Sequence, residues 1–486
     1  MANKSYFTTT LPYVNADPHL GFALELVQAD IVTRYHALLG DEILLNTGTD
    51  EHGLKIHRKA LEEGKDPQKY VDEYAAKFYD LIPTLGVTEK LNFIRTTNEH
   101  HIKATQAFWR LCAAKGDIYK KEYKVKYCVG CELEKTESEL VDGKCSVHPN
   151  LELELIEEEN YFFKFSKYQQ PLLELYKNKP QFVLPESRQN EIRAFVGRGL
   201  EDFSISRLAK KMPWGVPVPD DTDHVMYVWF DALVNYVSAV GWPEDETKFK
   251  SWWPVTQFAG KDNLRQQAAM WQAMLMSAGL PPSEQVVIHG FIQSGGQKMS
   301  KSLGNVINPL DLVKEYGTDA VRYFLARHVS SFEDSDVTLE KFKEAYNANL
   351  ANGLGNLVSR VMKMATANEI KFDENEVKRI AATEEFDNYH REHTAGFDDF
   401  EIQKATDVIW RGISAADSLI QQEQPFKKIK IDKTGAEKDI KNLLARLYFI
   451  AVMLEPIMPE TAKTILDLVM NNKMPGKPLF ARKWKS

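Results

Sequence analysis

The sequence predicts an α/β protein with a split Rossmann-type parallel sheet, a metal-knuckle insertion and an all-α C-terminal bundle. Three observations carry this prediction. Strand-like and helix-like stretches alternate from the N-terminus; a short, charged, cysteine-bearing stretch interrupts them after about Gly116; and beyond about Asp336 the apolar residues recur at helical spacing throughout. We therefore expect one sheet built in two halves, followed by a separate helical domain.

The first elements establish the parallel sheet. Residues 5–14, SYFTTTLPYV, are β-branched and aromatic, NADPHLG supplies a turn, and residues 22–40 repeat apolar side chains at helical spacing up to Gly40. Residues 41–53 form a second apolar strand that runs into a polar loop. Strand alternating with helix is typical of doubly wound sheets, whose ligands bind beyond the carboxyl ends of the strands.

The later segments complete the organisation. Residues 223–242 and 253–275 fit the second half of the same sheet, and residues 422–439 are expected to form a loop between two helices. The predicted divisions are a first half of the sheet domain, a connective insertion with the knuckle, a second half of the sheet domain and a helical domain, at residues 1–117, 118–222, 223–336 and 337–486.

Composition excludes several classes of protein. The 486 residues are 43% hydrophobic and 27% charged, as in globular proteins, with no apolar run as long as the ~18 residues of a membrane span. MANKSYFTTT lacks the apolar centre of a signal peptide, so we expect a cytoplasmic protein. The net charge of −8 is the wrong sign for a protein that coats nucleic acid non-specifically, although a local basic surface could still hold one.

Two separated motifs point to a phosphate site. GGQKMSKSLGN, residues 295–305, places Lys298 and Lys301 among glycines and serines, where flexible ammonium groups suit phosphate oxygens. DPHLGFAL places His19 and Gly21 at a helix start, where unpaired N–H groups attract anions. Either motif alone is more often a solvated face or an ordinary helix start; together they predict a polyphosphate ligand.

A cysteine and histidine cluster in the insertion predicts a metal centre. Cys128-x-x-Cys131 and Cys145-x-x-His148 provide three thiolates and one imidazole at the spacing of a closed, tetrahedral, structural zinc site. The alternative is a set of unrelated reduced thiols. Cys112 lies in the apolar helix-like stretch AFWRLCAAKG and is assigned to core packing.

HLGF and KMSKS resemble the two signature sequences of class I aminoacyl-tRNA synthetases, which activate an amino acid with ATP. Phe22 departs from the family, which usually has a polar residue there. The resemblance implies ATP with Mg²⁺, catalytic roles for His19, Gly21, Lys298 and Lys301, and a phosphate contact by Lys301 with Lys298 in support. The ATP site that it implies comprises His19, Gly21, Glu25, Gly260, Asp262, His289, Gly290 and Lys301.

Several further segments, among them NTGTDEHG, YVWFDALVNY and NLVSR, resemble the methionyl-tRNA synthetases, as does the single Cys3His knuckle of their bacterial type. This resemblance implies methionyl-adenylate formation with release of pyrophosphate and transfer to the 3′-terminal adenosine of tRNA(Met). The methionine site that it implies comprises Leu11, Tyr13, Asp50, Trp229, Ala232, Tyr236 and Gln267, with Asp50 on the substrate ammonium. Gln266 and Gln267 replace the family's usual phenylalanine–histidine pair.

The helical tail resembles the anticodon-binding bundle of the same family. Asn356 and Arg360 lie four residues apart, hence on one helix face, and match positions that meet the anticodon. Phe426 stands in EQPFKK where the family has a stacking tryptophan after a proline. The chain ends at LFARKWKS without the β-barrel module that makes many relatives dimeric, so we expect a monomer.

Three alternatives remain at this level. Cysteinyl-tRNA synthetase shares the chemistry but uses zinc to hold its substrate thiol. A small-molecule adenylating ligase of the pantothenate synthetase type needs neither a zinc knuckle nor a helical anticodon domain. A synthetase relative that has lost catalysis and binds RNA would not need intact His19, Asp50, Lys298 and Lys301, although Phe22 and Gln267 are consistent with it.

Overall fold

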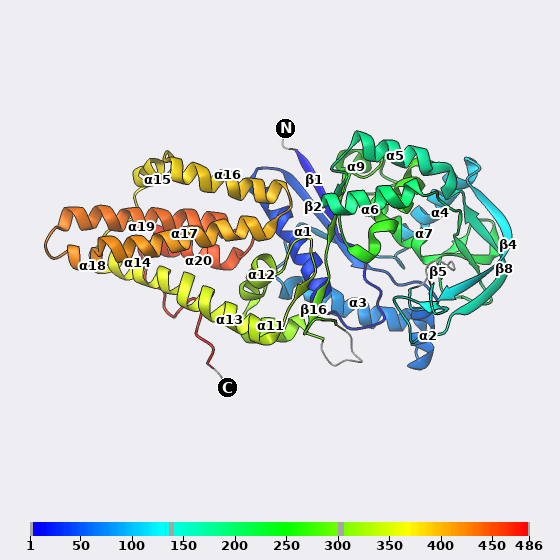
Figure 1. Ribbon diagram of the computed structural model, residues 1–486, viewed down its shortest axis with the longest axis horizontal. Coiled ribbons are helices and arrows are strands. Elements are labelled where there is room, and N and C mark those ends of the chain that lie inside the picture. The colour runs from blue at the N-terminus through cyan, green and yellow to red at the C-terminus, as the bar shows by residue number, and fades with distance from the viewer. Residues whose placement is uncertain (1–2, 132, 136–139, 300–305, 485–486) are drawn as a thin grey trace. The chain divides into compact units, whose positions relative to one another are not determined.

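The computed structural model describes residues 3–131, 133–135, 140–299 and 306–484 (Figure 1). The chain divides into two compact units. The first comprises Met1–Pro18, Gly40–Ile82 and Glu89–Ile288, and the second comprises His19–Leu39, Pro83–Thr88 and His289–Ser486.

The main sheet confirms the predicted α/β class. Among the described residues six strands lie in the order β3-β2-β1-β14-β15-β9, and the pairs β3–β2, β2–β1, β1–β14 and β15–β9 are parallel. Their bounds are Leu91–Arg95, Glu42–Thr49, Lys4–Thr8, Thr256–Gly260, Gln285–His289 and Val183–Leu184. Strand order reverses between β1 and β14, and such a switch point is where doubly wound sheets bind ligands.

The central strands are apolar on both faces, as in parallel sheets that are covered on both sides. Tyr6, Phe7 and Thr8 of β1 are all buried, and so are the last four residues of β15. The polar residues that follow each strand therefore gather at the carboxyl edge, where the buried apolar run stops.

The insertion is built on a long antiparallel pair, β4 (Ile118–Cys128) with β8 (Glu154–Phe163). The strand β5 (Leu133–Lys135) pairs with β4, and the short strands β6 (Leu140–Val141) and β7 (Lys144–Cys145) form a hairpin. Cys128 therefore ends one strand and Cys145 another, which delivers both thiols to the same end of the insertion.

One expected part of the main sheet lies elsewhere. Residues 223–226 belong to β13 (Asp221–Met226), which pairs antiparallel with β11 (Ser206–Leu208) and β12 (Pro217–Val218). The first half of β13 is partly or fully exposed, unlike the strands of the main sheet. Two short helices follow, α7 (Val228–Leu233) and α8 (Asn235–Ser238).

The second unit contains a small sheet of β16 (Ile292–Ser294), β17 (Gln297–Lys298) and β18 (Ser335–Asp336). Beyond β18 its described elements are all helices, as predicted for the chain after about Asp336. Its helices α14, α17 and α19 pack on one another, and α16 packs on α17 and α20 on α19 (Figure 1). Their bounds are Asn356–Ala367, Ile402–Glu423, Lys433–Leu454, Glu384–Asp398 and Pro459–Met470. No helix in the described part of the chain is both long and apolar enough to cross a membrane.

The prediction of one loop over residues 422–439 is wrong, because most of these residues are helical. Helix α17 ends at Glu423, α18 spans Pro425–Lys428 and α19 begins at Lys433. Gln424 adopts a left-handed backbone (φ 46°) and Pro425 opens the next helix, so one residue makes the break. Asp432 then caps α19 by accepting from the Gly435 N–H.

A buried arginine anchors helix α1 (Leu20–Leu38) within the second unit. Arg322, on α12 (Thr318–Arg327), is fully buried, and its Nη1 lies 2.7 Å from Asp30 Oδ2 of α1. Its remaining N–H groups donate to backbone carbonyls, including those of Pro456 and Ile457 at 2.9 and 2.8 Å. Because both charges are paired and hydrogen-bonded, the helix that begins beside His19 is firmly held.

Candidate functional site

The loops after β1 and β2 are joined through their backbones. The Asp50 N–H donates to the Pro12 carbonyl at 3.0 Å, and the Val14 N–H donates to the Asp50 carbonyl at 3.3 Å. These bonds make a parallel bridge between Tyr13 and Asp50. Leu11 and Tyr13 are therefore held beside the buried Asp50, so three of the candidate methionine residues lie together at the carboxyl edge of the sheet.

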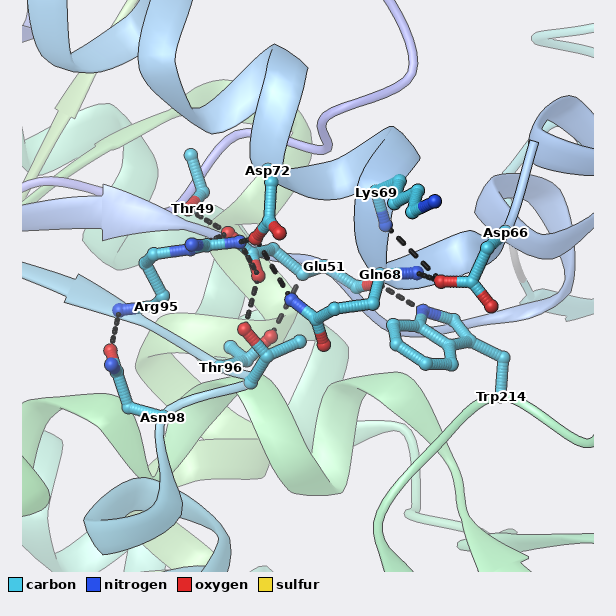
Figure 2. Close-up of polar contacts among 11 residues, drawn as sticks. Thr49, Glu51, Asp66, Gln68, Lys69, Asp72, Arg95, Thr96, Asn98 and Trp214 are labelled. Carbon is cyan, nitrogen blue, oxygen red and sulfur yellow. Dashed lines mark hydrogen bonds and ion pairs between the residues drawn. The ribbon is translucent and has the colours of Figure 1, made fainter. Parts of the chain in front are cut away.

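The residue after Asp50 is fixed by a buried ion pair (Figure 2). The carboxylate of Glu51 is fully buried and accepts from Arg95 Nε and Nη2 at 2.6 and 2.9 Å, and from Thr49 Oγ1 at 2.6 Å. Its backbone is held as well, because Trp214 Nε1 donates to the Glu51 carbonyl at 2.6 Å. Bidentate pairing to an arginine gives both direction and strength, so this side of the loop is rigid.

The other side of the loop is held by a buried carboxylate on α7. Asp231 Oδ2 lies 2.6 Å from His52 Nδ1, and Asp231 Oδ1 lies 2.9 Å from His101 Nε2. Burial raises the pKa of the Asp231 carboxyl, but the His52 and His101 contacts outweigh it and lower that pKa to about 2. Helix α7 also carries Trp229 and Ala232, so Asp231 ties these two candidates to the Asp50 loop.

We expect Asp231→Asn to destabilise the protein by about 1.5–3 kcal/mol at pH 7, the usual range for a hydrogen bond to a charged group. Because the pKa of Asp231 is depressed when folded, its contribution is full above the ordinary carboxyl pKa of 3.8 and declines as pH falls toward 2. Urea unfolding of the two proteins should therefore show a difference in unfolding free energy at pH 5 that shrinks below about pH 4. A difference that widens between pH 4 and pH 2 would contradict this assignment.

Aromatic side chains line the space next to Asp50. Tyr127, Tyr227 and Val228 form a small buried cluster against which Tyr13 and Trp229 pack. Trp229 Nε1 is buried and has no hydrogen-bond partner among the described residues. A buried indole N–H normally finds a partner, so this one is suited to a bound ligand.

Tyr236 lies on α8 and is buried with Gln267. The Tyr6 hydroxyl donates to the Tyr236 carbonyl at 2.9 Å, which fixes the start of α8 on β1. Gln267 Nε2 donates to the Tyr236 hydroxyl at 2.8 Å. Gln267 lies in a π-helical turn, Gln266–Met270, a feature often found at functional sites. Gln267 therefore contacts the pocket tyrosine itself.

Gly260 and Asp262 lie at the carboxyl end of β14. Gly260 is the last residue of the strand, and Asp262 follows in the single turn Lys261–Asn263 with its side chain exposed. The order β1-β14 places this turn directly beside the switch point of the sheet. An exposed carboxylate there can accept hydrogen bonds from the hydroxyls of a ribose.

In the second unit His19 caps helix α1. Its Nδ1 accepts from the Gly21 N–H at 3.1 Å, so the hydrogen of the neutral ring lies on Nε2, and the side chain is exposed. A Cβ at residue 21 would lie 2.9 Å from His19 Cε1. Glycine is therefore needed because the imidazole folds over it, and the pair presents an N–H donor at a helix N-terminus.

Glu25, His289 and Gly290 also lie together in the second unit. His289 Nε2 lies 2.7 Å from the Glu25 carboxylate, and His289 Nδ1 donates to the Gly290 carbonyl at 2.8 Å. A Cβ at Gly290 would lie 2.2 Å from the carbonyl carbon of Glu333, so only glycine fits. Lys298 lies in β17 (Gln297–Lys298), whereas Lys301 lies outside the described residues.

The four predicted metal ligands converge. The Sγ atoms of Cys128, Cys131 and Cys145 and a ring nitrogen of His148 all lie within 4.8 Å of one another. Cys131 Sγ is 3.5 Å from Cys145 Sγ and 3.1 Å from His148 Nδ1. Ligand atoms of a tetrahedral zinc are about 3.3–3.8 Å apart, given bonds of about 2.0–2.3 Å. The donor set and its spacing fit zinc.

The anticodon candidates lie on two elements of the helical unit. Asn356 opens α14 with its side chain exposed, and Arg360 Nη1 lies 2.5 Å from Asp417 Oδ1 of α17. Helix α17 ends just before α18, where the Phe426 side chain is 45% exposed. Lys427 Nζ lies 5.8 Å from the Phe426 ring. An exposed aromatic beside cations can stack on a nucleobase.

Sequence reasoning missed the residues that hold the site. Glu51 and Arg95 were not singled out, nor were His52, His101 and Asp231. One signal was present: Asp231 is the carboxylate in the apolar run YVWFDALVNYV, and a carboxylate buried in a helix must be paired. Its partners come from residues 52 and 101, which no periodicity connects with it.

Comparison with known families matches nearly the whole chain. The profile described as tRNA synthetases class I (M) matches residues 5–148 and 130–362, and that of the anticodon binding domain of methionyl tRNA ligase matches residues 370–478. The methionine–tRNA ligase of Thermosynechococcus vestitus is 40% identical over 474 residues, which cover 94% of this chain and 88% of that protein.

Two further comparisons agree. The methionine–tRNA ligase of Thermotoga maritima is 38% identical over 489 residues, which cover 98% of this chain and 76% of that protein. The solved structure of Mycobacterium tuberculosis methionyl-tRNA synthetase in complex with methionyl-adenylate has a TM-score of 0.90 at 36% identity. That match covers 96% of this chain and 94% of the other.

Proposed function

This chain belongs to the methionyl-tRNA synthetases, and we propose how its residues divide the work of the reaction. The enzyme activates L-methionine with ATP to methionyl-adenylate, releasing pyrophosphate, and then transfers the methionyl group to the 3′-terminal adenosine of tRNA(Met). The observation that carries the assignment of the amino-acid site is that Leu11, Tyr13 and Asp50 meet at the carboxyl edge of the sheet, beside the switch point.

Methionine is bound by a charge at one end and an apolar wall at the other. We assign the substrate ammonium to Asp50, whose loop is held in place through the two residues that follow, Glu51 by Arg95 and His52 by Asp231. Leu11, Tyr13, Trp229, Ala232 and Tyr236 surround the side chain, where ring edges pack well against a thioether. Gln267 supports Tyr236 through their 2.8 Å hydrogen bond.

Adenylation requires the methionine carboxylate to attack the α-phosphate while pyrophosphate leaves. Such transfers are accelerated by alignment and by neutralising the charge that develops on phosphate oxygens. We assign this role to the His19 N–H at the N-terminus of α1 and to Lys298 and Lys301, with Lys301 on the leaving group. Gly260, Asp262, Glu25, His289 and Gly290 complete the nucleotide site, Asp262 at the ribose.

Two metal ions fit this chemistry. Mg²⁺ bound with ATP supplies positive charge to the phosphates. A structural zinc is held by Cys128, Cys131, Cys145 and His148, one per chain, because three thiolates and an imidazole fill a closed tetrahedral site. Gly130 supports this arrangement: a Cβ there would lie 2.7 Å from His148 Cγ, so the turn between the first two cysteines leaves room for the imidazole.

We expect Cys128→Ser to lose its zinc and to loosen the insertion, because metal binding contributes folding free energy to small domains. Elemental analysis should find one zinc per wild-type chain and almost none in the variant, and the insertion should become sensitive to protease. The matched control is Cys112→Ser, which changes a buried thiol of α4 (Glu99–Ala114) outside the cluster and should keep its zinc. Wild-type protein purified without zinc would refute the assignment.

We further propose that the four segments 1–117, 118–222, 223–336 and 337–486 correspond to the first catalytic half, the connective insertion, the second catalytic half and the anticodon-binding domain. In the last of these, Asn356, Arg360 and Phe426 read the anticodon, with Phe426 stacking on a base. The protein is proposed to act as a cytoplasmic monomer.

The charging reaction tests the function directly. Incubation with ATP, methionine and a tRNA(Met) transcript should yield methionyl-tRNA, and a transcript with a replaced anticodon should be charged far more slowly. Arg360→Ala should lower kcat/KM for tRNA(Met) while ATP–pyrophosphate exchange stays unchanged. Tight binding of tRNA(Met) without either adenylation or charging would instead favour the RNA-binding relative that has lost catalysis.

A further inference from the structure

A chain of buried amides and hydroxyls leads from Tyr236 into the core of the first unit. Its members come from α8, the π-helical turn, β14, the segment before β15, and α10 (Trp271–Ala278). None is more than 2% exposed, so water cannot replace a missing partner and each hydrogen bond depends on its neighbours. We call Gln272, Ser283, Gln257 and Gln267 the amide relay.

The backbone sets the direction of the relay. The Ser283 N–H donates to Gln272 Oε1 at 3.0 Å, and Gln272 Nε2 donates to the Gln267 carbonyl at 2.8 Å. A backbone N–H can only donate and a carbonyl can only accept. The Gln272 amide therefore has one orientation, and its Nε2 also donates to Ser283 Oγ at 3.1 Å.

The orientation of the Gln272 amide determines which group donates in each of the following hydrogen bonds, up to the one at Tyr236. Because Ser283 Oγ accepts from Gln272, its own hydrogen goes to Gln257 Oε1 at 2.6 Å. Gln257 Nε2 then donates to Gln267 Oε1 at 2.9 Å, and Gln267 Nε2 donates to the Tyr236 hydroxyl at 2.8 Å. The Tyr236 oxygen is thus an acceptor toward Gln267, and its hydrogen points away from the relay.

The opposite direction is disfavoured at Ser283. If both Gln257 and Gln267 were turned over, Ser283 Oγ would face amide N–H groups from Gln257 and Gln272, and its hydrogen would lose the acceptor it has on Gln257. A buried donor without a partner disfavours a state by a factor on the order of ten or more. The relay is therefore polarised rather than free to run either way.

We propose that the amide relay consists of positioning residues that present the Tyr236 hydroxyl as a hydrogen-bond donor to the thioether sulfur of methionine. The inference rests on the proposed placement of methionine beside Tyr236. The sulfur is the only atom of that side chain that can take part in a hydrogen bond, and it can only accept. A hydroxyl whose hydrogen was taken by Gln267 would offer the sulfur a lone pair instead. The relay thus favours methionine over norleucine, which has a methylene in place of sulfur.

Two substitutions reverse or release the relay. In Gln257→Glu a carboxylate can only accept, so it takes hydrogen bonds from Ser283 and from Gln267 Nε2, and Gln267 Oε1 turns toward the Tyr236 hydroxyl. In Ser283→Ala the hydroxyl that orients Gln257 is removed. The readout is the ratio of kcat/KM for methionine to kcat/KM for norleucine in ATP–pyrophosphate exchange. This ratio does not depend on the fraction of active protein.

We expect Gln257→Glu to lower the methionine-to-norleucine ratio by roughly fivefold, the usual worth of one hydrogen bond. Ser283→Ala should lower it by a smaller factor. The matched control is Ser277→Ala, also on α10, which removes a buried hydroxyl that donates to Asp117 Oδ2 at 2.9 Å outside the relay. That variant should keep the wild-type ratio.

Two results would overturn the proposal. Either both relay variants keep the wild-type ratio, or they lower kcat/KM for methionine and norleucine by the same factor, as a purely structural role predicts. A wild-type protein that shows no methionine-dependent exchange would instead refute the methionine site itself, and the relay would lose its substrate. The two failures are therefore distinguishable.

Discussion

Asp50→Asn is expected to raise the KM for methionine by about two orders of magnitude while the KM for ATP changes little. Neutralising one partner of a buried, hydrogen-bonded charge pair costs about 2–5 kcal/mol, much of it from leaving the other charge without its counter-ion. Asp50 is buried, and the two residues that follow it, Glu51 and His52, are both held by hydrogen bonds, so the loop cannot move to bring another carboxylate to the ammonium.

The matched control is Asp223→Asn, which changes an exposed carboxylate of β13 and should leave both KM values unchanged. Initial rates of ATP–pyrophosphate exchange over a range of each substrate separate the two effects. If Asp50→Asn raised both KM values equally, or lowered only kcat, Asp50 would not be the partner of the methionine ammonium.

The second large effect concerns the leaving group. Lys301→Ala is expected to slow methionyl-adenylate formation by about 10²–10³-fold, the usual loss when one preorganised group that stabilises developing charge is removed. Methionine binding should be almost unaffected, because the proposed partner of the Lys301 ammonium is pyrophosphate and not the amino acid. Single-turnover adenylate formation and equilibrium dialysis with methionine measure the two quantities separately.

The matched control is Lys314→Ala, which removes an exposed lysine of α11 (Pro309–Tyr316) in the same unit. It should change neither the rate of adenylate formation nor the affinity for methionine. Lys298→Ala should slow adenylation less than Lys301→Ala does. Equal losses of methionine affinity and of rate in Lys301→Ala would show that this lysine supports the fold of the site instead of the chemistry.

Local signals in the sequence predicted much of the fold and the clustering of Cys128, Cys131, Cys145 and His148. The strands of the parallel sheet are short apolar runs, and the four candidate metal ligands form two compact pairs in the sequence, so both were predictable without knowledge of long-range contacts. The sequence also predicted that His19 and Gly21 lie at the start of a helix, as they do in α1. The reason for the glycine, an imidazole folded over residue 21, appears only in the structure.

The remaining features depend on contacts between distant residues. Asp231 meets His52 and His101, which lie 179 and 130 positions away in the chain. The direction of the amide relay depends on two backbone groups, the Ser283 N–H and the Gln267 carbonyl, and no pattern of residue types reveals their positions. Residues 223–226 resemble a strand of the main sheet in composition, but their pairing with β11 and β12 is decided by chain connectivity.

ATP–pyrophosphate exchange measured with each of the twenty standard amino acids tests the central claim most directly. The site described here predicts exchange that depends on methionine, with a kcat/KM for methionine far above that of every other amino acid. Exchange that depends on cysteine instead would contradict the specificity while leaving the nucleotide chemistry intact. No exchange with any amino acid would contradict the account as a whole.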